Sequence, residues 1–171
     1  MKTEFRKNTR LTDYDYKDDG YYFVTVVTRN RLPVLRDYKP EAVKSMNELS
    51  GFIKGVTIDY FVVMDNHIHV IFILEDCKRP LGQIVRAMKY NVTKLVAAGL
   101  PSRERKANSN SPATNRDKSK PHGNAAATDK GIWQWNYYEH VIRNEKALKK
   151  IREYVVNNPE AEKINFEKFY E

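Results

Sequence analysis

Three stretches in the first half of the chain have the apolar patterns of β-strands. Residues 21–28 and 56–64 are rich in aromatic and β-branched residues, which favour extended structure. Residues 67–74 continue this pattern after only Asp65 and Asn66, and a two-residue spacer suits a tight antiparallel hairpin. The pattern therefore predicts one separate strand followed by two adjacent strands joined by a short turn.

Three other stretches repeat their apolar residues at helical spacing. Residues 41–54 form the first predicted helix, and Pro80 opens the second. The third covers 145–158, with Asn144 as its N-cap and Pro159 as its stop signal. The stripe predicted to be buried on the second helix consists of Leu81, Ile84, Val85, Met88, Val92 and Leu95.

A fourth strand is predicted at residues 137–142, so the order of elements is β-α-β-β-α-β-α. This order predicts an α+β fold of the ferredoxin-like, split βαβ type: an antiparallel sheet with helices on one face, plus a C-terminal helix. Residues 99–130 contain no Phe, Trp or Tyr and are rich in small and polar residues. We expect them to be a disordered insertion within one domain of residues 1–171.

Composition narrows the class of protein. The single cysteine, Cys77, excludes an intrachain disulfide, which suits a reducing compartment, and we expect this thiol to be passive. No apolar run reaches the length of a membrane span, and the first residues lack the apolar core of a signal peptide. We therefore expect a cytoplasmic protein with no membrane partner.

The net charge of +8 is concentrated in one part of the chain. Residues 78–120 contain 11 Lys and Arg residues but only two acidic residues, Glu104 and Asp117. Such a basic stretch is typical of a protein that binds DNA or RNA. A solubilising surface loop would have the same composition, so charge alone leaves both interpretations open.

Two sets of residues are candidates for chemistry. His67 and His69 are separated by one residue on a predicted strand, so both side chains lie on one face and could bind a divalent metal. Tyr154 and Asn158 are four residues apart and share a face of the last helix. Each set also has a structural interpretation: polar residues on a half-exposed strand, and a half-buried tyrosine near a helix end.

Five motifs follow one another along the chain, at residues 22–31, 63–69, 133–134, 138–145 and 154–159. Taken together, they resemble the HUH (His-hydrophobic-His) single-tyrosine transposases, and most of all the REP-associated tyrosine transposases. One departure is Asp65, where that family often has proline, and another is the length of the insertion.

The resemblance implies metal-dependent cleavage and strand transfer of single-stranded DNA that contains a hairpin. Tyr154 would be the catalytic nucleophile and would form a 5′-phosphotyrosine intermediate. His67, His69 and Asn158 would hold the metal, with Mg²⁺ or Mn²⁺ favoured over Zn²⁺ because the site is loose and partly oxygen-donating. The sequence leaves open a monomer or a homodimer, and a tyrosine that acts in its own chain or in a partner.

Four cationic residues are candidates for contacts with DNA phosphates: Arg86, Lys89 and Lys94 on the second helix, and Arg143 after the fourth strand. Solvated helix faces would explain them equally well. Tyr90 could stack on an unpaired base or pack on the insertion.

Several alternatives remain at this stage. His140 is interpreted as structural, and Tyr137 and Tyr138 are weaker candidate nucleophiles because neither shares a helical turn with an amide ligand. The protein could be a non-cleaving hairpin DNA- or RNA-binding protein of the same fold. It could also be a metal-dependent phosphodiesterase that uses water as the nucleophile.

Overall fold

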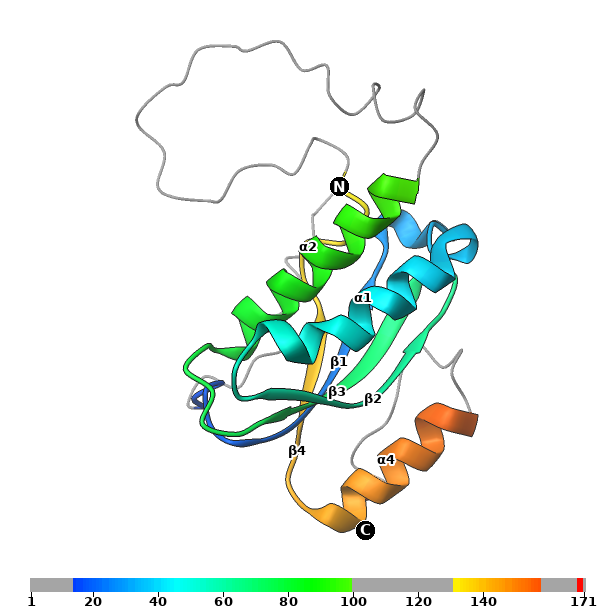
Figure 1. The fold of residues 1–171 in the computed structure, drawn as a ribbon. Helices are drawn as coiled ribbons and strands as arrows, with labels where there is room; N and C mark the ends of the chain where they lie inside the picture. The colour runs from blue at the N-terminus through cyan, green and yellow to red at the C-terminus, as the bar shows by residue number, and fades with distance from the viewer. Residues whose placement is uncertain (1–13, 100–130, 158–168, 171) are drawn as a thin grey trace, which may run out of the picture.

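The computed structural model describes residues 14–99, 131–157 and 169–170 (Figure 1). Apart from Gly99, the predicted insertion at 99–130 lies outside these residues, as does Asn158. Two short 3₁₀ helices, η1 (Arg29–Arg31) and η2 (Arg36–Tyr38), follow the first strand. The main elements are β1 (Gly20–Val27), α1 (Lys39–Phe52), β2 (Val56–Val63), β3 (His67–Leu74), α2 (Leu81–Gly99), β4 (Tyr138–Ile142) and α4 (Glu145–Asn157).

The four strands form one antiparallel sheet in the order β2-β3-β1-β4 (Figure 1). This order confirms the predicted ferredoxin-like arrangement, in which β1 and β3 are central and β2 and β4 are the edges. The register places Val27 opposite His67 at one end of the sheet and Gly20 opposite Leu74 at the other. The candidate histidines are therefore at the start of a central strand, which holds them rigidly.

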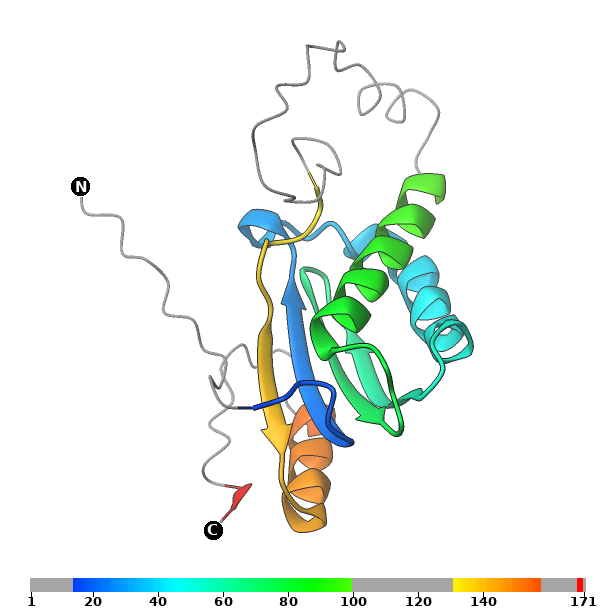
Figure 2. The same ribbon diagram turned by 90° about the vertical axis from the view of Figure 1, so that its left-hand side faces the viewer.

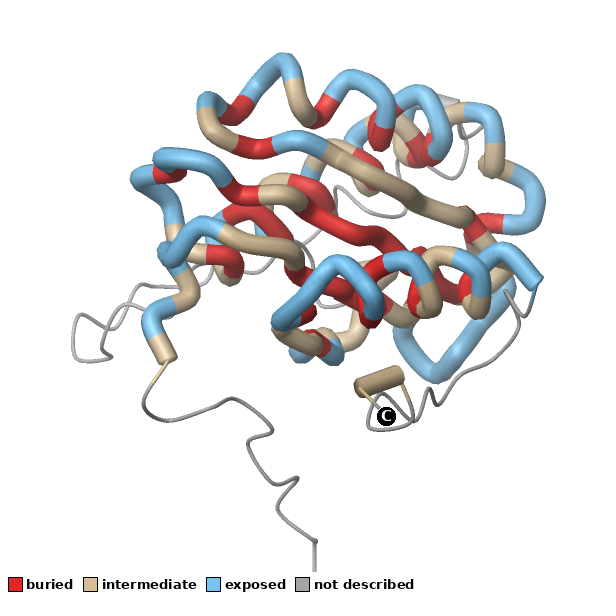
Figure 3. The backbone as a smooth tube through the Cα atoms, turned by 90° about the horizontal axis from the view of Figure 1, so that it is seen from below, coloured by how far each residue is buried: buried red, intermediate tan, exposed pale blue. Residues whose placement is uncertain are grey.

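Alternation along β3 sorts its side chains into two layers. Ile68, Val70 and Phe72 belong to the larger apolar core, which also contains the buried residues of α1 and α2. Ile71 belongs to a second cluster, formed with α4 on the opposite face of the sheet. Figure 2 shows α1 and α2 side by side, and Figure 3 shows the sheet between its two helical layers. The C-terminal helix thus covers the face that α1 and α2 leave open.

The buried stripe of α2 differs from the prediction at its end. Leu95 is only partly buried, and Val96 takes the core position instead. The helix runs to Gly99, so the four-residue spacing from Met88 and Val92 continues to residue 96.

Among the described helices, none is long and apolar enough to cross a bilayer.

The predicted two-residue hairpin between β2 and β3 is confirmed. The Met64 backbone N–H donates a 2.9 Å hydrogen bond to the His67 carbonyl, which closes the turn around Asp65. The Asp65 carboxylate accepts hydrogen bonds from Lys39 and Arg36, both at 2.9 Å, and these lower its pKa. Aspartate at this position therefore links the hairpin to η2 and α1, which proline could not do.

Candidate histidine and tyrosine site

His67 and His69 lie side by side on the face of the sheet that α4 covers. Their ring centroids are 4.6 Å apart, and the rings are inclined at 70°. His67 Nδ1 is 2.6 Å from Asn66 Oδ1, and His69 Nδ1 is 2.8 Å from Thr25 Oγ1 on the neighbouring strand. Phe23 stacks on His69 at a centroid distance of 5.4 Å. Each imidazole is therefore held in a defined orientation by a partner on the sheet or the hairpin.

The donor set of these two rings suits a divalent metal. Because both Nδ1 atoms are engaged, metal binding would use the two Nε2 atoms, with Thr25 and Asn66 orienting the rings from behind. Within the described part of the chain, no cluster of three His, Cys, Asp or Glu side chains could hold a metal ion. The predicted third ligand, Asn158, lies outside the described residues.

Both imidazoles are buried in this structure. The exposed fraction is 5% for His67 and 1% for His69. Neither ring is therefore directly accessible to a phosphate group in this structure.

The helix α4 is fixed to this face by its own cap and by an apolar stripe. The Asn144 side chain accepts a 2.8 Å hydrogen bond from the Ala147 N–H, which confirms the predicted N-cap. Leu148, Ile151 and Val155 are buried, and they form one cluster with Phe23 of β1, Ile71 of β3 and Ile142 of β4. This packing confirms the predicted buried face of the last helix.

Tyr154 lies beside that stripe and is partly buried, as its position on the helix predicts. Its ring meets the ring of Phe169 edge to face, with centroids 5.5 Å apart. Tyr154 is thus on the helix that covers the histidine face, at the boundary between the packed stripe and the surface.

An ion pair joins α4 to the edge strand β2. The β2–β3 register shifts between Ile58 and Tyr60, so Asp59 is the extra residue of a β-bulge. Tyr60 packs in the α4 cluster, and Asp59 accepts two hydrogen bonds from the Arg152 guanidinium, one of them 2.6 Å long. The bulge thus turns two consecutive side chains toward α4. No local sequence pattern indicated this pair, because its partners are far apart in the chain.

Residues near the C-terminus dock on the same layer. The Tyr170 hydroxyl lies 3.0 Å from His140 Nε2 and 3.2 Å from the Val141 carbonyl, and it accepts a 3.2 Å hydrogen bond from the Arg143 N–H. Burial and the nearby Arg143 charge lower the pKa of His140 to about 4, so the ring is neutral at pH 7. The interpretation of His140 as structural fits this arrangement.

The two alternative tyrosines face opposite layers. Tyr137 packs against the larger core, with the Lys89 ammonium 5.8 Å from its ring centroid. Tyr138 pairs with Thr25 in the β1–β4 register, so alternation directs it to the histidine face. Burial raises the pKa of Tyr138, which makes its phenolate harder to form. Burial therefore disfavours the ionised form of Tyr138, although its side chain lies on the histidine face.

The four candidate phosphate-binding residues do not surround the histidines. Arg86, Lys89 and Lys94 are on α2, in the helical layer on the other face of the sheet. Arg143 comes directly after Ile142 of β4, which pairs with Tyr21 of β1. Tyr21 is six residues from Val27, the partner of His67, so Arg143 is at the opposite end of the sheet from His67, about 20 Å away along the strands. The structure therefore separates the basic residues into two places, and phosphate contact by each of them stays a prediction.

Comparisons with known proteins identify the class of fold. The structure of a REP-associated tyrosine transposase bound to a REP hairpin superposes with a TM-score of 0.60 and 23% identity, covering 88% of this chain and 72% of that one. A crystal structure of a candidate transposase from Deinococcus radiodurans gives a TM-score of 0.51 with 15% identity, covering 86% of this chain and 95% of that one. The chain therefore has the fold of the tyrosine transposases, as its motifs suggested.

Sequence similarity places the chain in a family. An uncharacterized protein of Haemophilus influenzae is 32% identical over an alignment of 186 positions, gaps included, which covers 90% of this chain and 88% of that protein. The chain belongs to the same family as this H. influenzae protein. No family model matches the sequence.

Proposed function

We propose that this protein cleaves and rejoins single-stranded DNA through a covalent bond to Tyr154. The observation that carries the proposal is the adjacent pair of imidazoles, His67 and His69, whose ring centroids are 4.6 Å apart. This pair lies on the face of the sheet that α4 covers, and α4 is the helix that contains Tyr154. The tyrosine-transposase fold supports it, and one such protein has been solved bound to a REP hairpin. Hairpin-containing DNA is accordingly the substrate class that we propose.

The reaction requires one bond to form and one to break at phosphorus. The Tyr154 oxygen, after losing its proton, attacks a backbone phosphorus, and the bond to the 3′ oxygen of the preceding nucleotide breaks. The products are a 5′-phosphotyrosine and a 3′-hydroxyl that takes up a proton. Attack by a 3′-hydroxyl on the phosphotyrosine reverses these steps, so rejoining needs no ATP.

Two features of the chain assist this chemistry. His67 and His69 would hold Mg²⁺ or Mn²⁺, with Asn158 proposed as a third ligand, and a bound metal would neutralise charge on the phosphate and the leaving oxygen. Thr25 and Asn66 keep both Nδ1 atoms occupied, so that the Nε2 atoms are the ones presented. Arg86, Lys94 and Arg143 are exposed cations that could contact phosphates outside the reacting position.

The test is capture of the covalent intermediate. We expect labelled hairpin DNA with a single-stranded flank, incubated with the protein and Mn²⁺, to yield a labelled protein band on a denaturing gel. Tyr154→Phe should abolish the band, and His67→Ala with His69→Ala should reduce it by about a hundredfold or more, the range for loss of charge stabilisation at a reacting phosphate.

Tyr138→Phe is the matched control, because Tyr138 faces the histidine layer but has a raised pKa. It should leave the labelled band intact. If Tyr138→Phe removes the band and Tyr154→Phe does not, the nucleophile has been misassigned. If DNA fragments appear without any labelled protein, water is the nucleophile and the protein is a phosphodiesterase.

A second function is favoured by the burial of the histidines, which are 5% and 1% exposed. A protein that keeps this fold but recognises hairpin DNA or RNA without cutting it has no need to open the histidine face. Retention of the DNA in a native gel, with neither adduct nor fragments in the presence of Mn²⁺, would support this function.

A further inference from the structure

Lys89 binds the segment before β4, residues 133–136, to the side of α2. Its ammonium donates hydrogen bonds to the carbonyls of Gln134, at 2.9 Å, and Asn136, at 3.0 Å. The indole of Trp133 donates to the Lys89 carbonyl at 3.0 Å, so the contact is made in both directions. Burial in this contact lowers the pKa of Lys89 to about 8. The segment is therefore a fixed part of the surface and not a loose connection.

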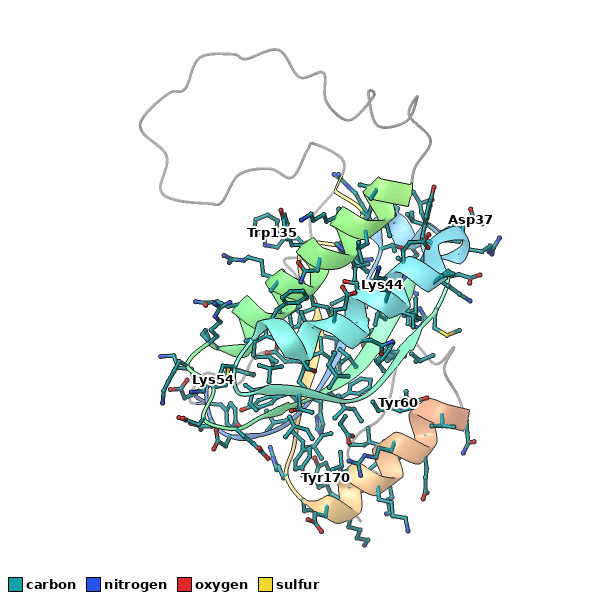
Figure 4. The ribbon with its side chains drawn as sticks, viewed as in Figure 1. Asp37, Lys44, Lys54, Tyr60, Trp135 and Tyr170 are labelled. Atoms are coloured by element: carbon teal, nitrogen blue, oxygen red, sulfur yellow. The ribbon has the colours of Figure 1, made fainter. Side chains whose placement is uncertain are left out.

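This anchoring presents Trp135 to solvent. The two carbonyls that Lys89 binds belong to the residues on either side of Trp135, and the Gln134 N–H also donates to Val27 of β1. The Trp135 side chain is nevertheless 89% exposed, and Figure 4 shows it beside α2. The backbone on both sides of Trp135 is therefore fixed, whereas its indole is almost fully exposed and contributes nothing to the core.

The neighbouring surface of α2 alternates positive charge with an aromatic ring. Arg86, Tyr90 and Lys94 are four residues apart, so they form one stripe with a spacing of about 6 Å, and all three are exposed. Lys89 and Thr93, which bind the 133–136 segment, are each three residues after a member of this stripe and so lie next to it. Trp135 and the stripe therefore belong to one surface.

The two described segments that form this surface contain no acidic residue. Neither α2 (Leu81–Gly99) nor residues 131–138 contain an aspartate or a glutamate. Exposed cations interleaved with exposed aromatic rings are the combination that binds single-stranded nucleic acid, in which phosphates meet the cations and unpaired bases stack on the rings. A protein partner would be expected to face a mixture of charges and a broader apolar patch.

We propose that Trp135 and Tyr90 form a stacking platform for unpaired bases of single-stranded DNA, with Arg86 and Lys94 contacting its phosphates. The proposal deepens the proposed function, on which it rests, by naming where the unpaired part of the substrate binds. The segment that holds Trp135 is bonded through Trp133 to Thr28, directly after β1, at the histidine end of the sheet. Single-stranded DNA bound on this platform could therefore reach the histidine face by passing around the edge strand β4. The histidine strand β3 lies two β-strand spacings, or about 10 Å, from β4.

The experiment is equilibrium binding of a fluorescein-labelled oligo-dT of about 12 nucleotides, a length that covers one such site. Binding is measured by anisotropy in EDTA, so that no cleavage takes place. We expect Trp135→Ala and Tyr90→Ala each to weaken binding about fivefold or more, the effect of losing one base–aromatic stack. Trp135→Phe should retain most of the affinity, because a smaller ring still stacks.

Phe52→Ala is the matched control, because Phe52 is 67% exposed at the end of α1 and lies outside the platform. It should bind like the wild type. Unchanged affinity in both Trp135→Ala and Tyr90→Ala would overturn the proposal. An equal loss of affinity for a blunt duplex would also overturn it, because the bases of a duplex cannot stack on side chains.

The phosphate contacts are tested by the salt dependence of binding. The double variant Arg86→Gln with Lys94→Gln should reduce the magnitude of the slope of log K against log salt concentration by about 1.4, whereas an unchanged slope would overturn the phosphate contacts.

This measurement separates the platform from the cleavage reaction. If Trp135→Ala loses affinity but no phosphotyrosine adduct is found with hairpin DNA, the platform stands and the proposed function fails. If the adduct forms and Trp135→Ala binds oligo-dT normally, the proposed function stands and the platform fails.

Discussion

At the scale of single residues, the orientation of the histidine pair depends on a hydroxyl that the sequence did not single out. Thr25 is buried in β1 and lies directly opposite His69 in the β1–β3 register. Its Oγ1, 2.8 Å from His69 Nδ1, leaves Nε2 as the nitrogen that would bind a metal. Removing a group that hydrogen-bonds the other ring nitrogen of a metal-binding histidine typically lowers metal affinity about 10- to 100-fold.

We predict that Thr25→Val, which keeps the shape of the side chain but removes its hydroxyl, weakens Mn²⁺ binding about 10- to 100-fold. Equilibrium dialysis with Mn²⁺ measures this directly, without any DNA. Thr57→Val, at an exposed threonine of β2, is the control and should bind Mn²⁺ like the wild type. Normal Mn²⁺ affinity in Thr25→Val would show that the Thr25 hydroxyl does not orient His69 for metal binding.

At the scale of elements, α4 illustrates how far a pattern predicts and where it stops. Its N-cap at Asn144 and its buried stripe through Leu148 and Ile151 follow from local spacing, and both are confirmed. The place where it docks depends on the Asp59 bulge, which directs a carboxylate to Arg152 from a strand 93 residues earlier in the chain. A bulge has no local periodicity of its own, because it is visible only when two strands are aligned.

We predict that Arg152→Gln lowers the free energy of unfolding by about 1 to 3 kcal/mol, because it leaves the largely buried Asp59 carboxylate without its charged partner. Urea denaturation followed by circular dichroism measures the change. Lys149→Gln, at an exposed position of the same helix, should change stability by less than about 0.5 kcal/mol.

A double-mutant cycle makes this prediction sharper. Asp59→Asn combined with Arg152→Gln should cost clearly less than the sum of the two single changes, because both remove the same interaction. Strict additivity would mean that the ion pair does not hold α4 to β2.

At the scale of the whole molecule, the sheet separates two candidate surfaces. The histidine pair and Tyr154 belong to the α4 layer, whereas the Trp135 platform and the α2 cations border the opposite layer. The two meet only around the β4 edge, at the end of the sheet where β1 finishes and β3 begins. A substrate that uses both surfaces must therefore contain a flexible single-stranded part next to its hairpin.

The docking of α4 also predicts which chain supplies the tyrosine. Because α4 packs on its own sheet through an apolar cluster and the Asp59–Arg152 pair, we expect Tyr154 to act in its own chain. A mixture of Tyr154→Phe protein with the His67→Ala, His69→Ala variant should then form no phosphotyrosine adduct. Recovery of about a quarter or more of wild-type adduct, the order expected from random pairing in a dimer that exchanges α4, would show action across two chains.

The sequence by itself determined the elements and the turns that join them. Each of these features depends on residues that are close together in the sequence, so the spacing of residue types is enough to predict it. This holds for the strands, the helices, the Asp65 hairpin and the Asn144 cap. The exception is at the end of α2, where Val96, four residues after the buried Val92, is buried and Leu95 is only partly buried. The pairing of His67 with His69 belongs to the same class, because alternation on a strand suffices to place both on one face.

Only the tertiary structure decided what lies around those residues. It decided that α4 covers the histidine face, that both imidazoles are buried, and that Lys89 binds two carbonyls and thereby exposes Trp135. The physical reason is that burial and hydrogen-bond partners are set by contacts between segments tens of residues apart. Which such contacts form depends on the packing of the whole chain, and no local spacing of residue types records it.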